Sequence, residues 1–230
     1  MSIITISRGS YSHGGEVAEK VAERLGYECV SREVLLEVSK EFNIPEIKLK
    51  RAIGHAPSSF EKYTFGRERY IAYIRAALVG YLKRDNVVYH GFAGHFFVED
   101  ISHVIKVRIN AEMSDRVRCM MNREKISSPE EALKMVKDVD KERRKWSLKL
   151  YDRDTWDCRL YDLVIKIDKI GIADAVDLIC DTIRRPAFQT TPESQRQIQQ
   201  RWEEARQKME EIAKGGAPFL EPMRSFPWSR

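Results

Sequence analysis

A loop of small and polar residues near the start of the chain is the first segment whose residue types suggest chemistry. The loop reads Arg8-Gly9-Ser10-Tyr11-Ser12-His13-Gly14-Gly15, between an apolar run at residues 2–7 and an amphipathic stretch at residues 16–25. A strand, a loop and a helix in this order point backbone N–H groups and the positive end of a helix dipole at one spot, where phosphate binds. We therefore expect a phosphate site, with a tight strand-to-helix turn as the alternative. The residues expected to contact phosphate are Gly9, Ser10, Ser12, Gly14 and Gly15.

The spacing of the loop glycines resembles the P-loop, whose sequence is G-x-x-x-x-G-K-[ST]. Residues 9–14 match its first half, but Gly15 stands at the position of the lysine and Glu16 at that of the serine or threonine. The positive charge of the lysine then has to come from elsewhere. Arg8 and His13 flank the loop, and His13 is the weaker candidate of the two. Glu16 either complements the helix dipole as a cap or binds Mg²⁺, directly or through water, in place of the hydroxyl.

A second group of charged residues, rich in arginine and lysine, lies between residues 113 and 160. Arginine suits phosphate binding because its planar guanidinium holds two phosphate oxygens and does not lose its charge. Arg116 and Arg123 are seven residues apart and so share a helix face, while Asp140 and Arg144 are four apart and are placed to pair. A solvated charged helix is the alternative. The density of the cluster favours a functional role.

Apolar patterns outline the elements that must position these residues. Strands are predicted at residues 27–30, 86–90, 104–109 and 161–167, in addition to the first apolar run. Helical patterns cover residues 32–85, 113–150 and 172–184. Parallel pairing of the strands at 86–90 and 104–109 across a helical crossover is the simplest arrangement. The alternation predicts an α/β three-layer domain with a mainly parallel sheet and helical insertions on one edge.

The C-terminal part of the chain, residues 186–230, begins with a polar linker and continues into a predicted helix at residues 193–214. Thr191 is the expected N-cap, and Pro192 suits the first turn. We expect the apolar stripe of this helix to pack back onto the parent domain, and a homodimer contact is the alternative. The stripe consists of Ile198, Trp202, Ala205, Met209 and Ile212.

The composition indicates a single well-formed core, because 43% of the 230 residues are hydrophobic and 33% are charged. No apolar run is long enough for a membrane span and no signal peptide is evident, so we expect a cytoplasmic protein. The four cysteines show no C-x-x-C pair, and we expect no zinc. A net charge of +5 suits a polyanionic partner such as a nucleotide. Nucleic acid is an unlikely partner, since basic and aromatic residues do not interleave.

Three segments resemble the cytidylate kinase-like family, a branch of the P-loop nucleoside monophosphate kinases. Ile6-Ser7-Arg8, with the residues up to Ala18, is similar to the family's loop, I-S-R-x-x-x-S-G-G-R-E-I-A, which also lacks the lysine. Ser31-Arg32-Glu33-Val34-Leu35 looks like the family's D-R-E-I-L. Residues 114–165 resemble its lid helices and last strand. The resemblance covers about residues 1–185.

The resemblance implies a three-layer P-loop kinase fold with a five-stranded sheet, a helical acceptor-binding lobe at residues 31–85 and a helical lid at 113–160. It implies a phosphotransferase that moves the γ-phosphoryl of Mg·ATP to a nucleoside monophosphate, CMP or dCMP. The loop would hold the ATP phosphates, Glu16 would help place Mg²⁺, and Arg32 would anchor the acceptor phosphate. The lid arginines that would neutralise the phosphoryl group are Arg116, Arg123, Arg143 and Arg144.

One segment departs from the family. Cytidylate kinases carry G-R-D-x-G after the third strand, where the arginine and aspartate help to recognise cytosine, but this chain reads His90-Gly91-Phe92-Ala93-Gly94. Gly91 and Phe92 offer an apolar wall that stacks a base without reading its edge. Together with the missing lysine, this leaves a second hypothesis open. The protein would then be a regulatory nucleotide-binding protein with weak or no catalysis.

Overall fold

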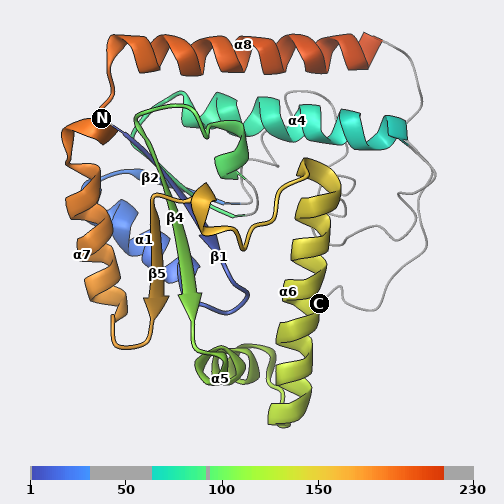
Figure 1. Ribbon diagram of the computed structural model, residues 1–230, viewed down its shortest axis with the longest axis vertical. Coiled ribbons are helices and arrows are strands. Elements are labelled where there is room, and N and C mark those ends of the chain that lie inside the picture. The colour runs from blue at the N-terminus through green and yellow to red at the C-terminus, as the bar shows by residue number, and fades with distance from the viewer. Residues whose placement is uncertain (1, 32–63, 92–93, 215–230) are drawn as a thin grey trace.

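A five-stranded parallel sheet forms the centre of the computed structural model, which describes residues 2–31, 64–91 and 94–214 (Figure 1). The strand order is β2-β3-β1-β4-β5, and every pair is parallel. The predicted α/β class and mainly parallel sheet are therefore confirmed. The strands are β1 (Ile3–Arg8), β2 (Glu28–Val30), β3 (Val87–His90), β4 (Val104–Ala111) and β5 (Leu163–Ile167).

The first strand lies in the middle of the sheet, between β3 and β4. Ile3 is in register with Val87 on one side and with Val104 on the other. The prediction that the strands at 86–90 and 104–109 pair with each other is therefore wrong. The physical reason is that β1 is buried on both faces, with Ile3 and Thr5 on one face and Ile4 and Ile6 on the other all at most 1% exposed, so it takes the central position. The connection from β3 to β4 contains a short 3-10 helix, η2 (Gly94–Phe97).

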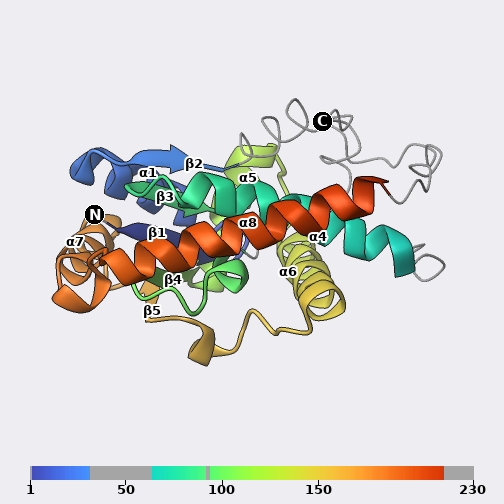
Figure 2. The same cartoon turned by 90° about the horizontal axis from the view of Figure 1, so that it is seen from above.

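Helices cover both faces of the sheet. On one face, α1 (Gly14–Leu25) and α7 (Ile172–Ile183) share a core with alternate residues of β1, β4 and β5. On the other face, α4 (Thr64–Leu82) and α8 (Pro192–Lys214) pack together over Ile3, Val87 and Val104. Figure 2 shows α8 crossing α4 at an oblique angle over this side of the sheet. The three predicted layers are thus present in the described residues.

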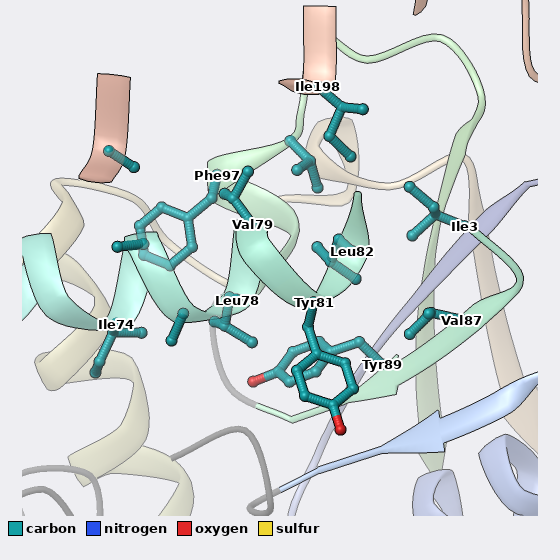
Figure 3. Close-up of a cluster of buried hydrophobic side chains, with 14 of the residues drawn as sticks. Ile3, Ile74, Leu78, Val79, Tyr81, Leu82, Val87, Tyr89, Phe97 and Ile198 are labelled. Carbon is teal, nitrogen blue, oxygen red and sulfur yellow. The ribbon is translucent and has the colours of Figure 1, made fainter. Parts of the chain in front are cut away.

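The last helix packs onto its own domain, as predicted. Thr191 caps it, because the Ser194 N–H donates to Thr191 Oγ1 at 3.1 Å, and the helix begins at Pro192. Ile198 is fully buried against α4 and η2, as Figure 3 shows, and Ala205 and Met209 are buried in the same cluster. The stripe is therefore covered by α4 of the same chain.

The helical tract predicted at residues 113–150 consists of two helices, α5 (Met113–Glu124) and α6 (Pro129–Tyr151). Lys125 ends α5 in the left-handed region, with φ of 56°, and the Ser128 hydroxyl accepts a hydrogen bond from the Glu131 N–H to begin α6. Two further 3-10 turns are η3 (Cys158–Leu160) and η4 (Pro186–Phe188). None of the helices in the described residues has the length and apolar character that a membrane crossing requires.

Candidate phosphate-binding site

The glycine-rich loop follows β1 directly and leads into α1, at the carboxyl end of the sheet, where β4 and β5 point toward α5 (Figure 1). Tyr11 and His13 have φ of 56° and 62°, a left-handed conformation that non-glycine residues rarely adopt. Each such residue stores about 1–3 kcal/mol of strain. Left-handed residues in a turn direct neighbouring N–H groups toward one side, as in anion-binding concavities. The loop is therefore a candidate phosphate site.

The start of α1 offers its first N–H groups to a ligand. The helix begins at Gly14, two residues before the predicted start, and His13, in the N-cap position, makes no side-chain hydrogen bond to it. The Val17 N–H donates to the His13 carbonyl at 3.0 Å, so the intrahelical bonds begin there. Uncapped N–H groups and the helix dipole together favour an anion at this point.

Ser12 fixes the loop from inside. Its hydroxyl is buried and lies 2.9 Å from the Gly9 carbonyl and 3.1 Å from the Ile109 carbonyl at the end of β4. The Gly9 N–H also donates to Ile109, at 3.2 Å. The predicted contact of Ser12 with phosphate gains no direct support, because the hydroxyl is engaged within the protein. Ser12 instead stabilises the loop conformation.

Arg116 and Asp140 hold Ser10 between α5 and α6. Arg116 Nε donates to the Ser10 carbonyl at 2.7 Å, and its Nη2 donates to Ser10 Oγ at 2.8 Å and to the Asp140 carboxylate. The Ser10 N–H and hydroxyl both donate to Asp140 Oδ1, at 3.1 and 2.7 Å. Ser10 and Arg116 are buried. This network ties the loop to both α5 and α6.

The predicted pair of Asp140 with Arg144 is wrong. The Arg144 guanidinium instead forms a bidentate hydrogen bond with Asp154, in which Nε donates to Oδ1 at 3.0 Å and Nη2 donates to Oδ2 at 2.6 Å. Arg144 Cζ also lies 4.9 Å from the centroid of the Trp156 ring. The reason is burial: Arg116 is almost enclosed beside the loop and needs the Asp140 carboxylate, whereas Arg144 is half-exposed. In the described residues Arg144 makes no contact with the loop.

Arg8 lies over the first turn of α1. A Cβ atom built on Gly14 would lie 2.7 Å from Arg8 Cβ, and one built on Gly15 would collide with Arg8 Nη1. The guanidinium therefore occupies the space where the side chain of a P-loop lysine would begin. On the other side of the loop, a Cβ on Gly9 would lie 3.5 Å from Arg116 Cζ. Two guanidiniums thus flank the loop where the lysine is missing.

A cavity of about 380 Å³ opens beside the loop, between its last residues and α5. His13 Nε2 lies 2.7 Å from Asp115 Oδ2 within it. Burial raises the pKa of the Asp115 carboxyl, but hydrogen bonds from His13 and Arg118 outweigh burial and hold this pKa below its usual range. The cavity therefore contains a stable carboxylate among cationic groups. Its lining residues are His13, Asp115, Arg118, Cys119, Asn122 and Arg123.

Glu16, in the first turn of α1, lies near Lys20 and His13. Its carboxylate lies 2.9 Å from Lys20 Nζ and 3.7 Å from His13 Nδ1. The residues that the structure describes contain no cluster of three or more His, Cys, Asp or Glu placed to hold a metal ion. Mg²⁺ commonly uses one or two carboxylates and completes its shell with water and substrate phosphates. A half-exposed carboxylate beside a phosphate loop fits that mode of binding.

Arg123 and Arg143 approach the loop at Tyr11. The Tyr11 hydroxyl donates to Glu124 at 3.0 Å. Burial and Glu124 raise the pKa of this hydroxyl, and the positive charges of Arg123 and Arg143 partly oppose the rise. Both guanidiniums are thus within electrostatic range of the loop and are exposed to solvent. Arg123 does not share the burial of Arg116, despite the helix face predicted for both.

The acceptor side is described only in part. Gly91 directly follows β3, its N–H donates to the Ile6 carbonyl at 3.3 Å, and a Cβ on it would meet the Tyr89 ring. Arg32 and Phe92, the other predicted acceptor residues, lie outside the described residues. Sequence reasoning missed the contribution of Asp115 and Asp140 to the loop. Their partners His13 and Ser10 are 102 and 130 residues away in the chain, so no local spacing signals them.

Comparison with known proteins places this geometry in context. The sequence profile of the cytidylate kinase-like family matches residues 3–169. An uncharacterized protein from Eubacterium ventriosum ATCC 27560 is 25% identical, with a TM-score of 0.61 over 80% of this chain and 100% of that one. Two further solved structures are less similar, each with a TM-score of 0.48. Shikimate kinase from Bacteroides thetaiotaomicron is 10% identical over 80% of this chain and 99% of that one. A gluconokinase from Sinorhizobium meliloti 1021 is 15% identical over 81% of this chain and 93% of that one. No curated protein matches the chain.

The family match begins in β1, includes the loop, α5 and α6, and ends just after β5. It spans the segments from which the resemblance was inferred, and it covers most of the chain. The chain therefore belongs to the cytidylate kinase-like family.

Proposed function

We propose that the protein is a phosphotransferase that moves the γ-phosphoryl group of Mg·ATP to a nucleoside monophosphate, with CMP or dCMP as the acceptor. The observation that carries this proposal is the position of Arg8. Its guanidinium lies against Gly15, where the P-loop lysine would begin, so the loop has a positive charge without that lysine. Family membership supports the reaction class, and the nucleotide acceptor follows from the family's name alone.

In this proposal the loop N–H groups and the start of α1 bind the donor phosphates, and Arg8 neutralises part of their charge. Arg116 positions the loop through Ser10, while Arg123 and Arg143 approach from the lid helices. Bound Mg²⁺ would neutralise phosphate charge, and Glu16 is the residue that would help to hold it. Phosphoryl transfer asks mainly for positioning and charge stabilisation, which these groups provide.

The residues proposed to bind the acceptor are those expected from the sequence. Arg32 is proposed to hold the acceptor phosphate, and Gly91 and Phe92 to form the wall beside the base. Arg144 is bound to Asp154 and takes part only if the lid rearranges. The segment lacks the arginine and aspartate that read cytosine, so discrimination among bases is expected to be weaker than in cytidylate kinases.

The test is a coupled assay of ADP formation from Mg·ATP with a panel of nucleoside monophosphates. CMP or dCMP should give the highest kcat/KM. Arg8→Gln, which keeps hydrogen-bonding capacity but removes the charge, should lower kcat/KM about 100-fold. Arg24→Gln is the matched control, because Arg24 lies at the far end of α1 and pairs with Asp177. Binding of ATP without ADP formation for any monophosphate would contradict the proposal.

A second candidate function is a nucleotide-binding regulator that does not turn over. The observation that favours it is the engagement of Arg116, whose guanidinium is already bound by Ser10 and Asp140 and is buried. This hypothesis expects ATP or ADP affinity and a ligand-dependent change in protease sensitivity, with no phosphoryl transfer. A phosphotransfer rate that Arg8→Gln abolishes would exclude it.

A further inference from the structure

A buried arginine lies on the sheet face opposite α1, next to the loop. Arg108 of β4 is in register with Ser7 of β1, so both side chains point to the same face. Arg108 is 8% exposed, and its Nη1 donates to Ser7 Oγ at 3.5 Å and to the Tyr161 hydroxyl at 3.3 Å. The Tyr161 hydroxyl in turn donates to the Thr155 carbonyl at 2.9 Å. The partners of Arg108 are thus uncharged hydroxyls.

Among the described residues no carboxylate pairs with Arg108. Lys106 offers a direct contrast, because it lies two residues earlier on the same face of β4 and pairs with Asp162 at 3.3 Å. A buried charge without a counter-ion is unfavourable and needs a compensating partner. Both hydrogen bonds of Arg108 start from Nη1, which leaves the Nη2 and Nε groups for a further acceptor.

A buried histidine stands beside this arginine. His95 is 3% exposed, its ring centroid lies 5.0 Å from that of Tyr161, and its Nε2 atom has no hydrogen-bond partner. Burial, together with the charges of Arg108 and Lys106, lowers the pKa of His95 to about 3, so the imidazole is neutral at physiological pH. A neutral imidazole nitrogen donates or accepts one hydrogen bond, and a buried polar atom without one calls for a partner.

The place of this group in the fold points to a ligand. Ser7 lies next to Arg8 at the carboxyl end of β1, and Arg108 lies at the same level of β4. In open parallel sheets, ligands bind at the carboxyl ends of the strands. These residues therefore lie near the glycine-rich loop, on the face of the sheet opposite α1 and α7.

We propose that Arg108, with Ser7, His95 and Tyr161, binds the phosphate group of the phosphate acceptor from the side of the sheet, a contact additional to the one proposed for Arg32. This set is called the Arg108 cluster. The inference rests on the proposed function, since it assigns residues to the acceptor of that reaction. The Nη2 and Nε groups of the guanidinium match the oxygens of a phosphate, and the hydroxyls and the imidazole supply neutral hydrogen bonds around it.

The test is isothermal titration calorimetry of the full chain, saturated with Mg·AMP-PNP so that the loop is filled. CMP, cytidine and inorganic phosphate are the titrants. Arg108→Met should weaken CMP binding at least tenfold while the affinity for AMP-PNP stays within twofold. Lys106→Met, the matched control on the same strand face, should leave CMP affinity within twofold. Cytidine, which lacks the phosphate, should bind wild type and Arg108→Met equally.

Equal CMP affinity of wild type and Arg108→Met would overturn the assignment. An Arg108→Met variant that loses affinity for cytidine as much as for CMP would also overturn it. A dependence on Arg108 for inorganic phosphate alone would also overturn it, because the cluster would then hold a free ion. If Arg108→Met does not fold, Arg108→Lys replaces it and should show the same tenfold loss, since it keeps the charge without the planar fork. Failure of wild type to bind AMP-PNP contradicts the proposed function instead. The CMP and phosphate titrations are therefore repeated without the analogue, and their dependence on Arg108 still decides the inference.

Discussion

The guanidinium of Arg8 occupies the space into which a side chain at Gly15 would extend. These residues come from different elements, the end of β1 and the first turn of α1. In a P-loop the helix itself carries the positive charge on its lysine. In this chain the strand contributes the charge, and the glycine makes room for it. Gly15 and Arg8 are therefore best understood as one unit.

Gly15→Ala should reduce ATP affinity with little effect on folding. The new Cβ meets the far end of the flexible Arg8 side chain, which moves away from the loop. We expect a change in unfolding free energy within about 1 kcal/mol, because alanine also favours the helix, and a loss of ATP affinity of about tenfold. In an Arg8→Ala background, Gly15→Ala should have no further effect on affinity. Binding titrations and urea denaturation measure both quantities.

Gly14→Ala is the counterpart in which folding should suffer. The new Cβ would lie 2.7 Å from Arg8 Cβ and 2.9 Å from Arg8 Cδ. Arg8 Cβ is attached to the backbone of β1 and cannot move unless that backbone moves. Overpacking of this kind costs about 1–3 kcal/mol. Urea denaturation should therefore show a clear loss of stability for Gly14→Ala beside the small change for Gly15→Ala. Equal stabilities for the two variants would contradict the packing described for Arg8.

The Arg116–Asp140 pair should show strong coupling. Removal of one partner leaves the other charge buried, and such changes cost about 3–5 kcal/mol. Arg116→Met and Asp140→Leu together should cost less than the sum of the two single changes, with a coupling energy of about 0.5–3 kcal/mol. A double-mutant cycle by urea denaturation measures it. Arg196→Ala, at an exposed pair with Glu193, is the control and should have little effect.

The loop and its surroundings differ in how far sequence could predict them. The strand, loop and helix of the candidate site were predictable because their signal is local: glycine spacing between an apolar run and an amphipathic stretch. The partners of Ser10 were not, because Arg116 and Asp140 lie 106 and 130 residues away. Local spacing assigned Asp140 to Arg144, whereas burial beside the loop decided in favour of Arg116. The lid arginines therefore divide into a buried anchor and exposed neighbours, which their spacing alone does not reveal.

The same distinction holds for the sheet. The apolar runs predict the strands, but the strand order depends on which strand is buried on both faces, and local sequence favours the pairing of sequential neighbours. The Arg108 cluster could not be predicted from the sequence for a related reason. Arg108 lies in an otherwise apolar strand, and its meaning depends on Ser7, His95 and Tyr161, which only the folded chain brings to one place.

His95 should make stability fall on acidification. Its pKa is about 3 in the folded protein and near 6.5 in an unfolded chain. Between these values the unfolded state binds a proton that the folded state does not, so the stability present above pH 6.5 is lost as pH falls toward 3. The slope attributable to His95 approaches about 1.4 kcal/mol per pH unit. His95→Gln should reduce the slope of wild type by this amount between pH 6 and 5, measured by urea denaturation, and an unchanged slope would show that His95 is not buried in its neutral form.

The contribution of α8 to the core is the last prediction. Ile198 is fully buried between α4 and η2, and Ile198→Ala should cost about 2–5 kcal/mol of unfolding free energy because the cavity cannot collapse between rigid helices. Gln200→Ala, two residues further on the exposed side, is the matched control and should change stability by less than about 0.5 kcal/mol. Thermal and urea unfolding of Ile198→Ala should remain a single transition, because α8 shares one core with Ile3 of the central strand. A separate early transition would show instead that α8 unfolds independently, and that the rest of the fold is stable without it.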